Sequence, residues 1–133
     1  MRLTAIVAVL VGWALVAGST QEKAATPVSF KSDVFPLIQK YCLPCHSEDE
    51  SNPSELSLDT YDQLKQGGKH GSPIVPGKSA ESLIIQKANQ DPPFGKRMPL
   101  NTQRKISEGK AKYLSDEEVK IISDWVDQGA ANN

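Results

Sequence analysis

The sequence has few aromatic residues and almost no excess of charge of either sign. Aromatic side chains make up only 6% of its 133 residues, while Gly and Pro contribute 9 each. So few large side chains give a thin core, and a bound apolar group, a metal or a partner would help the chain to fold. A net charge of −1 argues against nucleic-acid binding, which needs clustered excess Lys and Arg. The two cysteines exclude a disulfide-rich scaffold, and the length favours one domain.

The N-terminal segment has the pattern of a secretory signal peptide. Arg2 precedes an apolar run from Leu3 to Ala17, which is shorter than the roughly 20 residues of a membrane-spanning helix. We therefore predict a signal peptide over residues 1–19, a flexible lead-in over 20–28 and one domain over 29–133. The mature protein is then expected in the periplasm or another extracytoplasmic compartment. Association with a membrane is expected only if the segment is not cleaved.

Apolar spacing and capping residues predict an all-α domain without strands. Helices are expected from Ser32 to Cys42, from Thr60 to Gly67, from Ser79 to Ala88 and from Ser115 to Gly129. The last has the clearest start, because Glu118 completes a capping box with Ser115. Prolines make residues 91–99 irregular, and residues 100–113 have no clear pattern.

The strongest chemical motif is the pentapeptide CLPCH at residues 42–46, which has the CxxCH pattern of covalent c-type haem attachment. The thiols of Cys42 and Cys45 can reach the two vinyl groups of one porphyrin, and His46 can present a ring nitrogen to its iron. A CxxC disulfide is one alternative, and a zinc site that adds His70 is another. Both are weaker, because a redox CxxC usually lies in a βαβ unit and because adjacent Cys and His residues suit one tetrahedron badly.

The sixth position of the iron has two candidate ligands. Met98 is the only methionine besides the initiator, and it lies in an irregular loop. A thioether ligand would favour the reduced iron and raise its potential. His70, in a glycine-flanked turn, would give a lower potential, and an open or water-bound position is a third possibility. We also expect His46 to donate its ring N–H to a backbone carbonyl, with Pro53 and Pro73 among the candidates.

Basic residues gather in one segment late in the chain. They are Lys96, Arg97, Arg104, Lys105, Lys110 and Lys112, against the single acid Glu108. Such a segment is usually a solvated loop. Beside a haem edge, it could instead steer an acidic redox partner onto the protein.

With these residues identified, the chain from Phe30 to Ala131 resembles the small c-type cytochrome domain best known from planctomycete-like bacteria, a relative of the class I cytochromes c. The matching pieces are Phe30–Val34, Pro36–Ile38, CLPCHS at 42–47, Leu56–Thr60, Gly67–Gly68, Val75–Gly77, Ser82–Ile84, Arg97–Pro99 and Leu114–Ala130. The segment from Asn101 to Lys112 departs from the pattern and resembles an insertion after the Met98 loop.

The resemblance implies an all-α, cytochrome c-like bundle of about four to five short helices around one covalently bound haem. In it the first and last helices pack together, and His46 and Met98 are the axial ligands.

We expect a monohaem electron carrier that cycles between Fe(III) and Fe(II) and is not an enzyme. The alternative is a haem-based module that binds or senses a small ligand through a labile sixth position. A peroxidase-like enzyme is a third hypothesis, with no acid–base residues to support it. The residues expected to line the haem are Phe35, Tyr41, Leu83, Ile84 and Trp125.

Overall fold

The computed structural model describes residues 26–133, and its regular elements are all helical. Its elements are a π-helical turn η1 (Phe30–Val34), α1 (Phe35–Tyr41), α2 (Tyr61–Gln66), a 3-10 turn η2 (Ser79–Glu81), α3 (Leu83–Ala88), α4 (Gln103–Ser107) and α5 (Asp116–Asp127). Over these described residues the only β-type pairing is an isolated bridge between Gly68 and Gly71. The predicted all-α class is confirmed. The predicted signal peptide and most of the lead-in lie outside the described residues.

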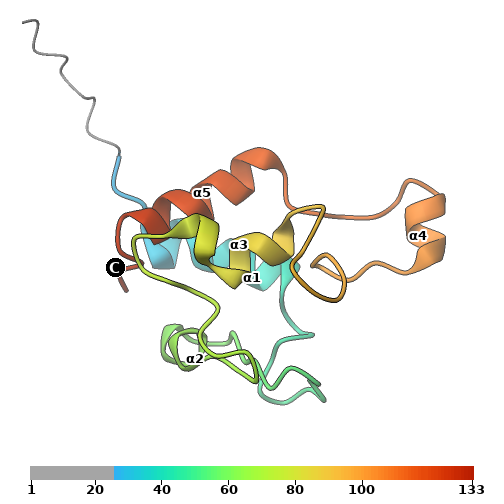
Figure 1. Cartoon of the computed structure of the whole chain (residues 1–133), viewed down its shortest axis with the longest axis horizontal. Coiled ribbons are helices and arrows are strands. Elements are labelled where there is room, and N and C mark those ends of the chain that lie inside the picture. Colours follow the sequence, from blue (N-terminus) through green and yellow to red (C-terminus); the bar gives the residue numbers. More distant parts are fainter. Residues whose placement is uncertain (1–25) are drawn as a thin grey trace, which may run out of the picture.

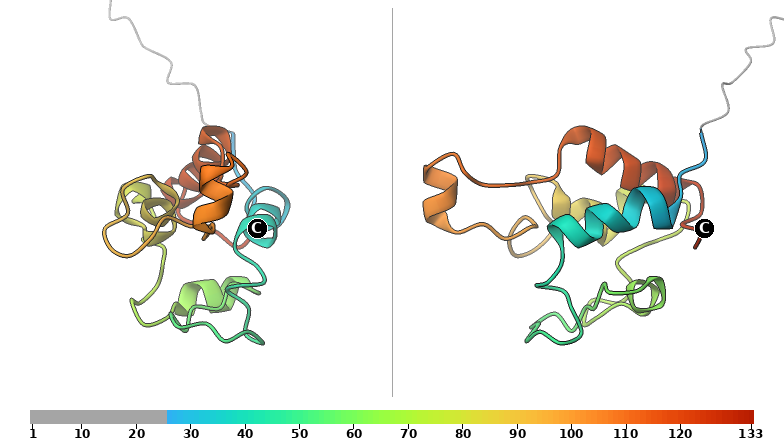
Figure 2. Two further views of the ribbon diagram at one scale, coloured as in Figure 1. Left: turned by 90° about the vertical axis from the view of Figure 1, so that its right-hand side faces the viewer. Right: turned by 180° about the vertical axis from the view of Figure 1, so that it is seen from behind.

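Helices α1, α3 and α5 pack together, and α2 lies with its loops on the other side of the molecule (Figures 1 and 2). The first and last helices meet through aromatic rings, as predicted. Trp125 is 1% exposed, and its ring centroid lies 5.3 Å from that of Phe30 and 6.5 Å from that of Tyr61. Its indole N–H donates to the carbonyl of Ala131 at 2.9 Å. Trp125 therefore belongs to the protein core, and the expectation that it lines a haem is wrong.

The first helix begins earlier than its sequence suggests. We predicted a start at Ser32, but the side chain of Ser29 accepts the N–H of Ser32 and the helical turn begins at Phe30. The C-terminal residue supports this start, since the Asn133 side chain and main chain accept N–H groups of Phe30 and Lys31 at 2.9 and 3.1 Å. Such a partner, about a hundred residues away, leaves no local sequence signal.

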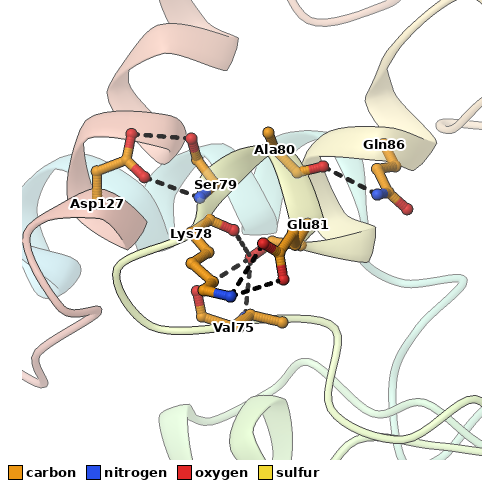
Figure 3. A network of polar contacts seen from close by, with 8 residues as sticks. Val75, Lys78, Ser79, Ala80, Glu81, Gln86 and Asp127 are labelled. Atoms are coloured by element: carbon orange, nitrogen blue, oxygen red, sulfur yellow. Dashed lines mark hydrogen bonds and ion pairs between the residues drawn. The ribbon is translucent and has the colours of Figure 1, made fainter.

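The predicted helix from Ser79 is broken at Ser82. This serine is fully buried, and its hydroxyl donates to the Lys78 carbonyl at 2.9 Å and accepts the Val75 N–H at 2.8 Å. These contacts hold Ser82 in an extended conformation between η2 and α3. Figure 3 shows how η2 is fixed to the end of α5, where the Asp127 carboxylate accepts both the N–H and the hydroxyl of Ser79 at 2.8 Å.

The last helix follows its sequence signals, and the segment before it does not. α5 has the capping box of Ser115 and Glu118 in both directions. Residues 100–113 form an excursion that carries the short helix α4 away from the other helices (Figure 1). The side chain of Asn101 closes its base, with 3.1 Å hydrogen bonds to both the carbonyl and the N–H of Lys112.

Candidate functional site

Cys42, Cys45 and His46 lie on one turn at the end of α1. The N–H of Cys42 donates to Ile38 at 2.8 Å and completes the helix, and the N–H of His46 donates back to the Cys42 carbonyl at 3.1 Å. The turn therefore brings the two thiols and the imidazole together without continuing the helix. Both cysteines are free thiols. Burial, with a smaller contribution from the neighbouring thiol of Cys45, raises the pKa of Cys42 to about 11, so its thiol is neutral at pH 7.

The imidazole of His46 is held by the main chain of a later loop. Its Nδ1 lies 3.2 Å from the carbonyl oxygen of Leu56. Because a carbonyl can only accept, Nδ1 carries the proton and Nε2 keeps its lone pair for a metal. A backbone acceptor was predicted, but neither Pro53 nor Pro73 provides it. The acceptor lies ten residues beyond His46, in a loop whose path depends on tertiary contacts.

Residues 52–58 form that loop, and several contacts fix it against the CLPCH turn. The N–H of Leu58 donates to the His46 carbonyl at 2.8 Å, and the N–H of Lys69 donates to the Ser54 carbonyl at 2.9 Å. Gly68 packs directly on the loop, since a Cβ there would stand 2.4 Å from the carbonyl oxygen of Ser54. A side chain at residue 68 would therefore push the loop, and with it the Leu56 carbonyl, out of place.

Met98 is held from a different element. Its N–H donates to the Lys87 carbonyl on α3 at 2.7 Å. The neighbouring Arg97 donates to the Ala88 carbonyl at 2.7 Å and places its guanidinium 4.1 Å from the ring centroid of Tyr113. The loop is thus irregular, as predicted, yet it is fixed to the last turn of α3. Met98 is half-buried.

His70, in its glycine-flanked turn, is exposed. Its imidazole stacks against Phe94, with 4.4 Å between the ring centroids. Lys87 lies on the same phenyl ring at 4.7 Å and donates to the Phe94 carbonyl. The turn that follows α2 therefore contacts the loop that carries Met98. The sequence gives no sign of this contact, because His70 and Phe94 belong to different motifs.

The residues present fit a haem better than they fit zinc. Among residues 26–133 no group of three or more His, Cys, Asp or Glu side chains is placed to hold a metal ion. The zinc alternative needs such a group, so the structure does not support it. Two free thiols and an imidazole of fixed tautomer match the donor set of c-type attachment. Four of the residues expected to line a haem keep part of their surface exposed: Phe35, Tyr41, Leu83 and Ile84.

Comparison with known families agrees with this donor set. Residues 42–99 match the family model described as Planctomycete cytochrome C. The match supports a planctomycete-type cytochrome c domain at these residues. The matched residues run from the first cysteine of the CLPCH turn to the proline after Met98. No curated protein and no solved structure matches the chain.

A planctomycete-type cytochrome c domain suggests a c-type cytochrome and implies haem c. Cytochrome c domains are generally electron carriers and not enzymes. The turn η1 and helix α5, which lie outside the matched residues, contribute the Phe30–Trp125 side of the core. Within the part of the chain that the structure describes, every helix is too short or too polar to cross a lipid bilayer.

Proposed function

We propose that the protein is a monohaem electron carrier that works outside the cytoplasm. The observation that carries the proposal is the 3.2 Å contact between His46 Nδ1 and the Leu56 carbonyl, beside two free thiols on the same turn. A ligating histidine usually donates its second ring nitrogen to such an acceptor, which fixes the ring and raises its basicity.

Each site residue has a distinct role in this proposal. Cys42 and Cys45 would tether the porphyrin through thioether bonds, and His46 Nε2 and Met98 Sδ would bind its iron. The haem supplies an iron that exchanges one electron between its ferric and ferrous states. The hydrogen bonds of Met98 and Arg97 to α3 hold the loop that carries Met98, so that little rearrangement accompanies electron transfer. If both His46 and Met98 bind the iron, they would leave it no position for a substrate.

We further propose that the basic segment 96–112 docks an acidic redox partner. Not all of its charges are available, because Arg97 is folded onto Tyr113 and because Glu108 pairs with Arg104 and Lys110 at 3.3 and 3.0 Å. The remaining cations are Lys96, Lys105 and Lys112, all exposed. A small charged surface suits a transient electron-transfer complex. Export would depend on the predicted signal peptide over residues 1–19.

Optical spectroscopy tests the central proposal. The full chain, produced in a host that matures c-type cytochromes, should be red, should keep its haem after denaturation, and should show the reduced bands of a His/Met-ligated haem. A colourless protein would refute the function. Mixing the reduced protein with carbon monoxide separates the carrier from the sensing module, because only a labile sixth ligand allows a rapid and complete shift of the Soret band.

A further inference from the structure

The carbonyl that holds His46 has a second hydrogen-bond donor. The side-chain amide of Asn52 donates to the same Leu56 oxygen at 2.6 Å, which is shorter than the 3.2 Å contact from His46. The orientation of the Asn52 amide is fixed, because its Oδ1 accepts both the N–H and the hydroxyl of Ser54 at 3.2 and 2.6 Å. Its NH₂ group must therefore face Leu56.

We propose that Asn52 is a positioning residue that sets the reduction potential of the haem by competing with His46 for the Leu56 carbonyl. This inference rests on the proposed function, because it requires His46 to ligate the iron. A carbonyl oxygen that already accepts a short hydrogen bond is a weaker acceptor for a second donor. His46 Nδ1 then keeps more of its proton, and the imidazole is a less basic ligand.

The direction of the effect follows from the charge on the iron. A more basic imidazole stabilises the ferric state, and a less basic one favours the ferrous state. Asn52 therefore raises the potential in the native protein. Removal of its NH₂ donor leaves the Leu56 oxygen to His46 alone, which strengthens that hydrogen bond and lowers the potential.

The test measures the midpoint potential of the haem-loaded full chain for two variants of Asn52. Asn52→Ala removes both halves of the amide. Asn52→Asp keeps the acceptor for Ser54, removes the donor to Leu56 and adds a negative charge. We expect each to shift the reduction equilibrium at least threefold toward the oxidised form, which is about 28 mV at 59 mV per tenfold change for one electron.

Two controls separate competition from other causes. Ser51→Asp adds the same charge at the neighbouring, exposed position, and the Asn52→Asp shift is counted only beyond it. Ser54→Ala weakens the turn but keeps the Asn52 donor, so its potential should stay close to that of the native protein. In the reduced protein, the Nδ1–H resonance of His46 should also move downfield in both Asn52 variants as its hydrogen bond shortens.

The outcomes are distinct from those of the proposed function. A native protein without haem refutes the function itself. If the native protein is a reversible cytochrome, an unchanged or raised potential in the Asn52 variants overturns the competition and leaves the carrier function standing.

Discussion

Glu118 joins the last turn of α1 to the first turn of α5, directly beside the CLPCH turn. One carboxylate oxygen accepts the hydroxyl of Tyr41 at 2.7 Å and the N–H of Ser115 at 2.9 Å. The other accepts the ammonium of Lys40 at 2.9 Å. Substitution of Glu118 by Ala should therefore loosen the packing of the two helices at the point where the chain enters the site.

The cost of Glu118→Ala can be estimated from its contacts. The side-chain half of the capping box contributes about 0.5–1 kcal/mol. The hydrogen bond from Tyr41 to a carboxylate contributes about 1.5 kcal/mol. The exposed pair with Lys40 adds little, since surface ion pairs are screened by water. We expect a loss of roughly 2–2.5 kcal/mol, measured by urea unfolding of the haem-loaded protein at pH 7.

The pKa of Glu118 predicts how the stability of the protein depends on pH. Partial burial by itself raises the pKa of Glu118, but hydrogen bonds from Lys40, from the Ser115 N–H and from Tyr41 outweigh it and lower that pKa below its ordinary value of 4.5. A lowered pKa in the folded state means that the ionised group stabilises the protein above pH 4.5 and that this contribution is lost as the pH falls through the folded pKa. Glu118→Gln keeps a side-chain oxygen as hydrogen-bond acceptor but does not titrate. The free energy of unfolding of this variant should therefore depend less on pH in the acid range.

Glu117→Ala is the matched control, because it removes a charge from the same helical turn at an exposed position. It should cost less than Glu118→Ala, because the exposed Glu117 carboxylate has only its hydrogen bonds to its own backbone and to Ser115 and its interaction with the helix dipole. If Glu118→Ala destabilises the protein no more than Glu117→Ala does, the contacts to Tyr41 and Ser115 contribute nothing, and the reasoning is wrong.

Three further predictions concern the haem and the core. Replacement of both Cys42 and Cys45 by Ala should leave the chain without haem and poorly folded, and native-like helicity and melting in far-UV circular dichroism would contradict this. Met98→Ala should abolish the spectrum of thioether ligation and open the iron to carbon monoxide, while His70→Ala should leave the spectrum unchanged; the opposite pattern would identify His70 as the ligand. Trp125→Ala should cost about 3–5 kcal/mol as a fully buried aromatic side chain, and a loss below 1 kcal/mol in urea unfolding would show that its cavity collapses.

Local signals in the sequence were sufficient where a short segment contains all of its own partners. Ser115 and Glu118 cap α5 reciprocally, as predicted, because both groups lie within one turn. Thr60 caps α2 by accepting the N–H of Gln63, and Gly67 ends the helix with a φ of 74°. The prediction failed at Ser82, where the hydroxyl meets main-chain groups that a turn brings back onto it.

The amino-acid sequence by itself is enough to predict the chemistry proposed for this protein, because the CxxCH spacing, the single internal methionine and the scarcity of aromatic side chains are all properties of the linear chain. Only the tertiary structure decided which carbonyl receives the His46 proton and which side chain competes for it. The reason is physical: Leu56 reaches His46 through a loop that Gly68 and Lys69 hold in place, and contacts between separate loops leave no periodic pattern along the sequence.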